Sequence, residues 1–221
     1  MSTVLVTGAN RGIGLEFCRQ HQQRGDQVIA VCRQSSDALS ALDVRVESGI
    51  DLIDESDREG LLQRLAGVSL DRVVLNAGLL ETIGLDALDL DSIRRQFELN
   101  ALAPLALTRA LLPMMGKGAK LALVTSRMGS IDDNTSGGSY GYRMSKVALN
   151  MAGRSLSIDL KARGIAVAIV HPGLVRTRMI EFNPRGIPPE QAVEGLMARV
   201  DELTLETTGT FWHANGEVLP W

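Results

Sequence analysis

The segment Thr7-Gly-Ala-Asn-Arg-Gly-Ile-Gly14 decides the fold of this 221-residue chain. It follows a short apolar run, Val4–Val6, and opens an amphipathic stretch, so its glycines stand at a strand-to-helix turn. Residues without a Cβ atom let the backbone turn tightly and approach a pyrophosphate, whose charge is favoured by the N–H groups and dipole of a helix N-terminus. The spacing is Gly-x-x-x-Gly-x-Gly rather than Gly-x-Gly-x-x-Gly, and the alternative is a tight turn with glycines for packing.

The rest of the chain repeats this alternation of strand and helix. Short, nearly continuous apolar runs, typical of strands covered on both faces, occur at 4–6, 28–31, 72–75, 121–124, 165–170 and 209–212. Amphipathic segments lie between them at 13–24, 56–66, 91–115, 140–162 and 189–203, and helices should end near Gly25, Gly67, Gly116 and Gly164. The pattern predicts a single α/β domain over residues 1–221, a Rossmann-like, doubly wound parallel sheet flanked by helices.

Composition argues against several classes of function. A hydrophobic content of 45% and a charged content of 22% indicate a globular chain, and a net charge of −3 gives no reason to expect nucleic acid or an anionic membrane as partner. No apolar run approaches the ~20 residues that span a bilayer, and no signal peptide is visible, so we expect a soluble cytoplasmic protein. Cys18 and Cys32 lack metal-like neighbours, and His21 and His213 show no partner spacing, so no metal site is expected.

A second motif, Tyr142-Arg-Met-Ser-Lys146, lies in the predicted helix 140–162. One helical turn separates Tyr142 from Lys146, so both face the same side. A nearby ammonium stabilises a phenolate and would bring the tyrosine pKa from about 10 toward neutrality, as an acid or base requires. The alternative is a solvated helix face, because Tyr-x-x-x-Lys is frequent by chance. Tyr140 is a rival, but the residue four positions on is Met144, which favours a packing or substrate-facing role.

The residue after the second strand bears on cofactor choice. Folds that prefer NAD place an Asp or Glu about 20 residues past the glycines, where it holds the ribose 2′-hydroxyl. This chain has Arg33 there and Arg11 inside the glycine loop, and two guanidinium groups suit a 2′-phosphate. The sequence therefore favours NADPH or NADP over NADH. The alternative is that Arg33 is a surface residue, which depends on where Asp37 lies.

Two further residues stand at positions suited to chemistry. Pro104 has no N–H, so the carbonyl of Asn100 loses its intrahelical partner, and a kinked helix there could hold a water; an ordinary packing helix with a proline kink is the alternative. Ser126 follows the strand 121–124, at the edge where ligands collect in parallel sheets, and its hydroxyl can donate to a developing alkoxide. Ser130 is its rival.

Together these motifs resemble the short-chain dehydrogenase/reductase family. The residues that carry the resemblance span nearly the whole chain: Thr7-Gly-x-x-x-Gly-Ile-Gly14, Asn76-Ala-Gly78, Asn100, Ser126, Tyr142-x-x-x-Lys146 and Pro172-Gly173. Within the family the chain looks most like the small carbonyl reductases of the sniffer and C-factor type, from Ser126-Arg-Met-Gly-Ser130, Gly137-Gly-Ser-Tyr140 and the ending Asn215–Trp221. It departs from the family in a longer gap before the tyrosine, where Ile131–Ser139 looks like an insertion.

The resemblance implies roles for individual residues. Asn100, Ser126, Tyr142 and Lys146 correspond to the catalytic tetrad, and His171 to a structural, hydrogen-bonded histidine. The implied cofactor-binding residues are Gly8, Asn10, Arg11, Gly12, Ile13, Gly14, Arg33, Asp51, Leu52, Asn76, Ala77, Gly78, Tyr142, Lys146, Pro172, Gly173, Val175 and Thr177.

The implied activity is NADPH-dependent reduction of a ketone or aldehyde, with a small carbonyl compound or alcohol as substrate. The alternative is a dinucleotide-binding signalling or regulatory protein of the C-factor type with little or no turnover. Relatives pair through the helices that correspond to 91–115 and 140–162, so a homo-oligomer is expected. A short lid over the substrate is expected at Met179–Pro188. Leu219–Trp221 would pack at the oligomer interface or cover its own subunit.

Overall fold

The sheet follows the predicted doubly wound order. The computed structural model describes residues 1–221 and contains seven strands, all parallel, in the order β3-β2-β1-β4-β5-β6-β7. Because the chain builds outward from β1 to β3 and then returns to place β4 beside β1, a crevice forms beyond the carboxyl ends of these two central strands. The strands are β1 (Thr3–Thr7), β2 (Gln27–Val31), β3 (Arg45–Glu47), β4 (Leu70–Leu75), β5 (Met115–Val124), β6 (Ala166–His171) and β7 (Phe211–His213).

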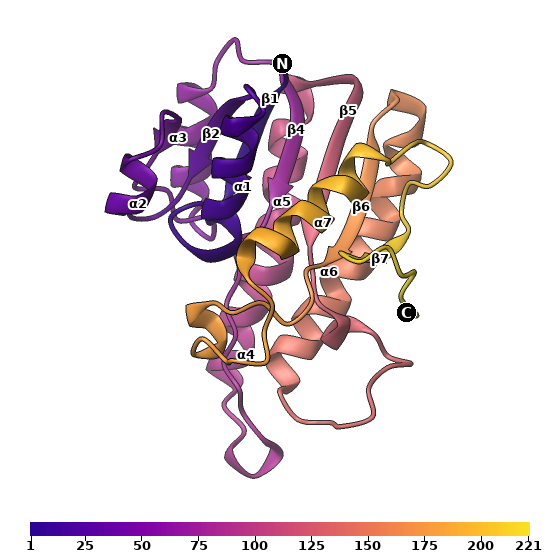
Figure 1. Cartoon of the computed structure of the whole chain (residues 1–221). Helices are drawn as coiled ribbons and strands as arrows, with labels where there is room; N and C mark the ends of the chain where they lie inside the picture. Colours follow the sequence, from indigo (N-terminus) through magenta and orange to yellow (C-terminus); the bar gives the residue numbers. More distant parts are fainter.

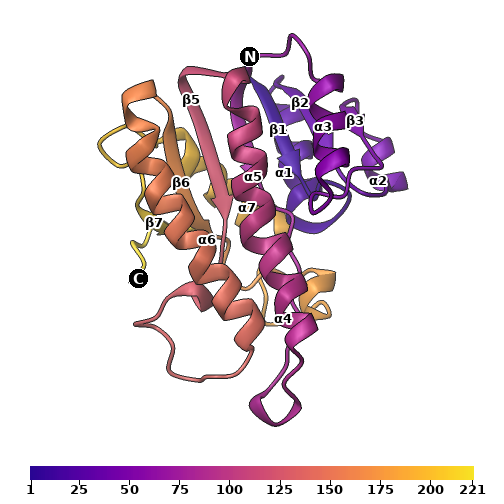
Figure 2. The ribbon, with the colours of Figure 1, turned by 180° about the vertical axis from the view of Figure 1, so that it is seen from behind.

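Helices cover both faces of the sheet. Figure 1 shows α1 (Gly12–Gln23) and α7 (Pro189–Asp201) in front of it, and Figure 2 shows α3 (Glu55–Arg64), α5 (Ala103–Leu111) and α6 (Tyr140–Asp159) on the opposite face. Two short helices, α2 (Asp37–Ser40) and α4 (Leu90–Phe97), complete the set of α-helices. No helix combines the length and hydrophobicity needed to cross a bilayer.

Strand alternation divides the buried side chains into two cores. Val4 and Val6 of β1 pack on the α1 and α7 side, whereas Leu5 between them packs on the α3, α5 and α6 side. Each core contains 21 buried residues, so the two faces of the sheet are buried to a similar extent. This explains why the strands read as continuous apolar runs rather than as alternating ones. Cys18 and Cys32 lie in the first core as free, buried cysteines.

The segment predicted at 91–115 is helical from Leu90 to Met114, but it is not one regular α-helix. α4 ends at Phe97, a π-helical turn covers Glu98–Leu102, α5 ends at Leu111, and a 3₁₀ turn covers Leu112–Met114. Pro104 cannot donate to the carbonyl of Asn100, and the N–H of Ala103 instead reaches back five residues to the carbonyl of Glu98. The helix irregularity that was expected near Asn100 and Pro104 is therefore a π-helical turn.

Gly116 does not end a helix, because it lies inside β5. The predicted strand 209–212 is also shifted, since β7 starts at Phe211. Both β3 and α2, which are short, were not predicted.

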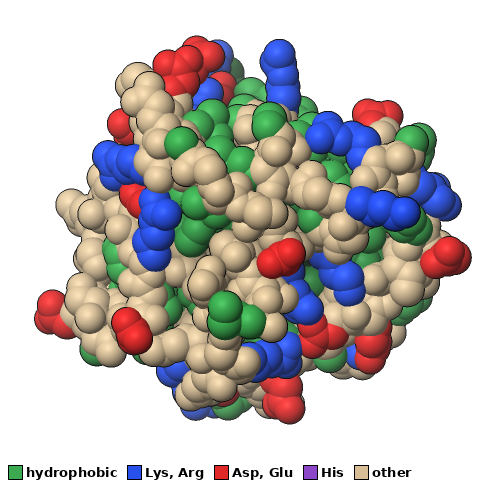
Figure 3. Space-filling model, turned by 90° about the horizontal axis from the view of Figure 1, so that it is seen from above, with side chains coloured by type: hydrophobic (Ala, Val, Ile, Leu, Met, Phe, Trp, Pro, Cys, Tyr) green, Lys and Arg blue, Asp and Glu red, His purple; other side chains and the backbone are tan.

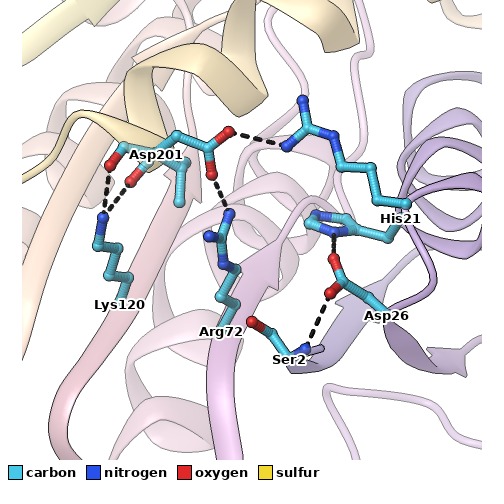
Figure 4. Close-up of polar contacts among 8 residues, drawn as sticks. Ser2, His21, Asp26, Arg72, Lys120 and Asp201 are labelled. Atoms are coloured by element: carbon cyan, nitrogen blue, oxygen red, sulfur yellow. Dashed lines mark hydrogen bonds and ion pairs between the residues drawn. The ribbon is translucent and has the colours of Figure 1, made fainter.

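The amino edge of the sheet carries a polar network that anchors α7 (Figure 4). The carboxylate of Asp201, at the end of α7, is bonded to Arg24 at 2.8 Å and also to Arg72 of β4. The ammonium of Lys120 donates to the carbonyl of Val200 at 2.8 Å and to that of Asp201 at 2.7 Å. Three elements therefore hold the last turn of α7, far from the carboxyl edge of the sheet.

His21 has a hydrogen-bond partner that its spacing in the sequence does not indicate. Its Nδ1 lies 2.8 Å from Oδ2 of Asp26, whose Oδ1 accepts from the N–H of Ser2 at 2.8 Å (Figure 4). The partner is five residues away across a turn, a spacing that no helical or strand periodicity indicates. Burial lowers the His21 pKa, although the hydrogen bond that the ring donates to Asp26 opposes this.

Charges of both signs are mixed over the surface. Figure 3, the view from above Figure 1, shows Lys and Arg side chains interspersed with Asp and Glu rather than gathered by sign. A mixed face of this kind creates no extended positive potential.

Candidate active site

The glycine loop between β1 and α1 has no room for side chains. Gly8 and Gly12 adopt positive φ angles of 65° and 55°. A Cβ atom on Gly8 would lie 2.8 Å from Cα of Ala77, and one on Gly14 would lie 2.2 Å from the carbonyl oxygen of Gly8. Thr7 holds the loop against the end of β4, since its Oγ1 accepts from the N–H groups of Asn76 at 3.0 Å and Ala77 at 3.2 Å. Packing alone thus requires glycine at two of these positions.

The helix that follows the loop begins without a cap. Arg11 precedes α1 and forms no side-chain capping bond, and no acidic residue lies in the first turn of α1. The first N–H groups and the positive end of the helix dipole therefore remain available to an anion. Gly12 also contacts the segment after β6, because a Cβ on Gly12 would lie 3.3 Å from Cγ2 of Thr177.

A cavity of about 1210 Å³ extends from this loop along the carboxyl edge of the sheet. It exceeds the roughly 300–1,000 Å³ of most small-ligand pockets, which suits an elongated dinucleotide. The predicted residues that line it are Gly8, Asn10, Arg11, Gly12, Ile13, Arg33, Asp51, Leu52, Asn76, Ala77, Gly78 and Thr177. The predicted residues that do not line it are Gly14, Asn100, Ser126, Tyr142, Lys146, Pro172, Gly173 and Val175.

Arg33 stands at the rim of the cavity. Its side chain is 69% exposed, and its Nη1 lies 3.8 Å from Oδ2 of Asp51, a loose ion pair. Asp37 is exposed and does not line the cavity, so no carboxylate follows β2 where a ribose 2′-hydroxyl would need one. Arg11 and Gln34 also line the cavity.

Tyr142 and Lys146 lie together in a dry environment at the start of α6. Tyr142 is 8% and Lys146 4% exposed, and Nζ of Lys146 lies 5.7 Å from the centre of the tyrosine ring. Nζ also donates to the carbonyl of Val124, the last residue of β5, at 3.0 Å. Gly78 lies next to this ammonium, since a Cβ on Gly78 would be 3.6 Å from Nζ. The end of β4, the end of β5 and α6 therefore converge on Lys146.

The expectation that Lys146 lowers the tyrosine pKa is not met. Burial raises the pKa of Tyr142 to about 12, with the Ser126 hydroxyl acting in the opposite direction. Burial also lowers the pKa of Lys146 to about 8. Desolvation outweighs attraction here because both groups are removed from water and the lysine is turned toward a backbone carbonyl. The chain's own groups thus keep Tyr142 protonated at neutral pH.

The Ser126 hydroxyl bonds to the side chain of Tyr142, and this bond acts to lower the tyrosine pKa. Oγ of Ser126 accepts from the N–H of Met128 at 3.1 Å, and the residue is 7% exposed. The rival Ser130 is engaged elsewhere, because its Oγ donates to the carbonyl of Trp221 at 3.1 Å. The other rival, Tyr140, is 37% exposed at the first position of α6.

Asn100 is buried, and its side-chain amide is fully used. Its Oδ1 accepts from the N–H of Leu79 at 2.7 Å, and its Nδ2 donates to the carbonyl of Leu79 at 2.8 Å and to Oγ of Ser145 at 2.9 Å. Asn100 therefore ties the segment after β4 to α6. The neighbouring Gln96, which sequence reasoning missed, binds Glu81 in the same two-point way.

His171 differs from its expected state. Burial lowers its pKa to about 3, and its Nδ1 is buried without a hydrogen-bond partner. Its ring instead lies edge-on to that of His213, with 5.0 Å between the ring centres. The prediction of a fully hydrogen-bonded histidine is therefore wrong at Nδ1.

The segment after β6 forms a short lid. Val175 is buried and pairs with Ile187, and Leu174 accepts from the N–H of Ile187 at 2.8 Å, so the lid is a closed loop. Met179 and Phe182 line the cavity while remaining 46% and 61% exposed. Two apolar side chains of this loop thus contribute to the lining of the cavity.

Leu219–Trp221 covers its own subunit. Leu219 is buried and donates its N–H to Phe211, on whose ring Trp221 stacks at 5.5 Å.

Comparison with known proteins agrees with this arrangement. Residues 2–186 match the family model described as short chain dehydrogenase. The chain is 45% identical over 226 residues, covering 100% of both chains, to 1-hydroxy-2-glutathionyl-2-methyl-3-butene dehydrogenase of a Rhodococcus strain. It is 42% identical over 155 residues to C-signal of Myxococcus xanthus, covering 69% of this chain and 93% of that one.

Two solved structures share the whole fold. The NADPH-bound carbonyl reductase from chicken fatty liver has a TM-score of 0.89 at 28% identity, covering 100% of this chain and 99% of that one. The carbonyl reductase Sniffer of Drosophila melanogaster has a TM-score of 0.91 at 26% identity and full coverage of both chains. With the glycine loop, the parallel sheet and the Tyr–Lys pair, these matches establish that the chain belongs to the short-chain dehydrogenase family of oxidoreductases, as a relative of C-signal and the sniffer-type carbonyl reductases.

Proposed function

We propose that this protein reduces a ketone or aldehyde with NADPH. The observation that carries the proposal is the meeting of a protonated tyrosine, a buried lysine and a serine hydroxyl beside a cavity of dinucleotide size. Tyr142 donates the proton to the carbonyl oxygen, and Ser126 donates a hydrogen bond that orients it. The raised pKa of Tyr142 suits this acid role, because the phenol holds its proton at neutral pH.

Other residues hold the cofactor, which supplies the hydride. The glycine loop and the start of α1 bind the pyrophosphate, and the segments Asp51–Leu52 and Asn76–Gly78 border the adenosine. Lys146 binds the nicotinamide ribose, whereas Pro172, Gly173, Val175 and Thr177 border the nicotinamide. The side-chain amide of Asn100 is already hydrogen-bonded to Leu79 and Ser145. If Asn100 supports a proton relay, it therefore does so through its main-chain carbonyl.

Tyr142→Phe tests the assignment. The variant keeps the ring and loses the proton, so it should bind NADPH normally and lose most turnover of a carbonyl substrate. NADPH binding measured by thermal shift is the control for folding. Carbonyl reduction at the wild-type rate would disprove the role of Tyr142.

We propose NADPH rather than NADH as the cofactor. Arg33 and Arg11 both line the cavity, and no carboxylate follows β2 at the place that an NAD-binding site requires. The Arg33–Asp51 pair is loose enough for a phosphate to displace it. Titration with both cofactors should show tighter binding of NADPH, and Arg33→Ala should remove the difference. Equal affinities in the wild type would contradict this choice.

We further propose that the substrate carries the carbonyl or alcohol on a thiol conjugate. The support is the 45% identity to a dehydrogenase named for a glutathionyl alcohol. The apolar lid residues Met179 and Phe182 suit the hydrocarbon part of such a molecule. Turnover of matched carbonyl compounds with and without a glutathionyl group is the test.

The second candidate function is a signalling or regulatory role with little turnover, which the 42% identity to C-signal favours. Complementation of cells that lack the protein distinguishes the two functions. If a Tyr142→Phe chain that still binds NADPH restores the phenotype, the role is one of binding. If it does not, and the wild type does, the role requires turnover.

The chain should form a homo-oligomer. Met144, Met151 and Ile158 lie exposed at intervals of seven residues along α6. Leu102, at the end of the π-helical turn, and Leu105 of α5 are also exposed. Figure 2 shows the two helices on one face. Light scattering after size exclusion should give more than one chain per particle, and Met151→Lys should reduce the mass of the particle.

A cytoplasmic location stays a prediction.

A further inference from the structure

The turn that carries Ser126 is short and has few bonds of its own. Ser126 precedes a single 3₁₀ turn, Arg127–Gly129, and its carbonyl accepts from the N–H of Gly129 at 2.8 Å. α6 supports this turn, because Nδ2 of Asn150 donates to the carbonyl of Gly129 at 3.1 Å. The hydrogen bonds within a 3₁₀ turn have poor geometry, so contacts from other segments are needed to fix the place of the Ser126 hydroxyl.

Arg127, the residue next to Ser126, ties the turn to two other segments. Its Nη2 lies 2.9 Å from Oε1 of Glu217, in the segment that follows β7. Its Nε lies 2.6 Å from Oδ2 of Asp133, in the segment that leads to Tyr142. The three charged side chains are between 36% and 47% exposed, and ion pairs this exposed contribute little to stability. Loss of Arg127 should therefore leave the protein folded.

Trp221 adds two bonds just beyond the turn. Its main-chain oxygen accepts from Oγ of Ser130 at 3.1 Å and from the N–H of Asp132 at 2.8 Å. Figures 1 and 2 both show the C-terminus close to the loop that precedes α6. Residues 217–221, which we call the strap, therefore hold the turn and the loop at three points, the pair with Arg127 included.

The strap is itself fixed to the central sheet. It folds back on β7, because the N–H of Leu219 donates to the carbonyl of Phe211 at 2.8 Å, and β7 pairs with β6. Leu219 is buried, and the ring of Trp221 stacks on that of Phe211 with 5.5 Å between the ring centres. This support of the serine turn lies beyond residue 186, where the match to the family model ends.

We propose that Arg127 and the strap are positioning elements, which hold the Ser126 hydroxyl against Tyr142 and the substrate carbonyl. The Ser126 hydroxyl bonds to the side chain of Tyr142. A donor stabilises a reacting oxygen only within about 2.7–3.1 Å, so a shift of about 1 Å at the turn weakens both contacts. The inference rests on the proposed oxidoreductase function and adds to it residues that act through Ser126 rather than on the reactants.

Fluorine NMR tests the inference without turnover. The chain has two tyrosines, so labelling with meta-fluorotyrosine gives few signals, and Tyr140→Phe assigns them. Arg127→Gln should shift the Tyr142 signal in the same direction as Ser126→Ala, because both changes weaken the bond between serine and tyrosine. The shift should vanish when Arg127→Gln is made in the Ser126→Ala protein. A Tyr142 signal that stays in place, or a shift of equal size in both backgrounds, would overturn the inference.

Kinetics test it on the proposed reaction, with NADPH and para-nitrobenzaldehyde as the carbonyl probe. Arg127→Gln should lower kcat about tenfold, as expected for the loss of one hydrogen bond, while the melting temperature and the Kd for NADPH stay at their wild-type values. In the Ser126→Ala protein the same change should cost nothing further, because the residue through which Arg127 acts is gone. An equal loss of kcat in both backgrounds would refute the positioning role.

Arg143→Gln is the matched control for the loop. Arg143 donates to Oγ of Ser136 at 2.8 Å and to the carbonyl of Gly137 at 3.2 Å, and it forms no bond to the strap. Its kcat should be close to that of the wild type. A loss as large as that of Arg127→Gln would assign the effect to the loop as a whole and count against the strap.

Trp221 variants repeat the test from the strap. Trp221→Phe keeps a ring stacked on Phe211 and should behave like the wild type, whereas Trp221→Ala should lower kcat and shift the Tyr142 signal. If Arg127→Gln does not fold, this pair of variants decides. If the wild type binds NADPH and reduces no carbonyl compound, the oxidoreductase proposal fails, and the fluorine signals still test the positioning. If the wild type is active and neither Arg127→Gln nor Trp221→Ala moves the Tyr142 signal, only the positioning role fails.

Discussion

Gly14→Ala should destabilise the protein although it places alanine, the best helix former, inside a helix. Gly14 lies in the first turn of α1 and is buried. Helix propensity alone would stabilise the variant by about 1 kcal/mol. The new Cβ, however, would lie 2.2 Å from the carbonyl oxygen of Gly8 and 2.7 Å from Nδ2 of Asn76. The first contact is with backbone, so it cannot be relieved by a side-chain rotation.

The magnitude follows from these opposing effects. Overpacking in a tight site costs about 1–3 kcal/mol, and a contact near 2.2 Å belongs at the upper end. After the propensity gain is subtracted, a net loss of about 2 kcal/mol remains. For a domain of this size that loss lowers the melting temperature by roughly 4–8 °C. Separation of β1 from α1 would also disturb the N–H groups of the glycine loop, so NADPH should bind more weakly.

Gly60→Ala is the matched control. Gly60 lies inside α3, has an ordinary φ angle, and would place a Cβ with nothing within 4 Å. This variant should be more stable than the wild type by about 0.5–1 kcal/mol and should bind NADPH unchanged. Urea unfolding and thermal melts with and without NADPH measure both effects.

If Gly14→Ala proved as stable as Gly60→Ala and bound NADPH like the wild type, the steric account of the loop would be refuted. Weak NADPH binding with full stability would instead place the effect in the anion site alone.

Three other predictions concern separate parts of the molecule. His171 has a folded pKa of about 3 against 6.5 unfolded, so its contribution is fully present above pH 6.5 and is lost as the pH falls toward 3. The loss reaches about 2 kcal/mol at about pH 5, and His171→Asn should flatten that part of the urea-unfolding profile. Asp201→Asn should destabilise the fold by about 1 kcal/mol by weakening the bonds to Arg24 and Arg72, whereas Glu202→Gln, on an exposed pair, should change stability little, and neither should alter NADPH affinity. Ser126→Ala should lower kcat about a hundredfold while Ser130→Ala, whose hydroxyl bonds Trp221, should keep kcat within a few fold.

The sequence determined the architecture and most of the cofactor loop. Apolar runs without alternation indicate strands buried on both faces, and the structure has two equal cores for that reason. The glycine loop could be predicted because everything that determines it is local. The turn, the start of the helix and the residues without a Cβ all lie within eight residues of sequence. The same local logic gave the Tyr142–Lys146 pair, since one helical turn joins them.

The tertiary structure alone decided which interactions those residues make. The pKa values of Tyr142 and Lys146 follow from burial by surrounding elements, and burial opposes the effect that their spacing in the sequence suggests. The bonds of His21 to Asp26 and of Asn100 to Leu79 join segments with no common periodicity. The sequence did not indicate the role of Gln96 for the same reason, because the segment it binds at Glu81 becomes its neighbour only when the chain folds back on itself. Spacing along one helix is a property of sequence, whereas desolvation and pairing between distant segments depend on where the whole chain places them.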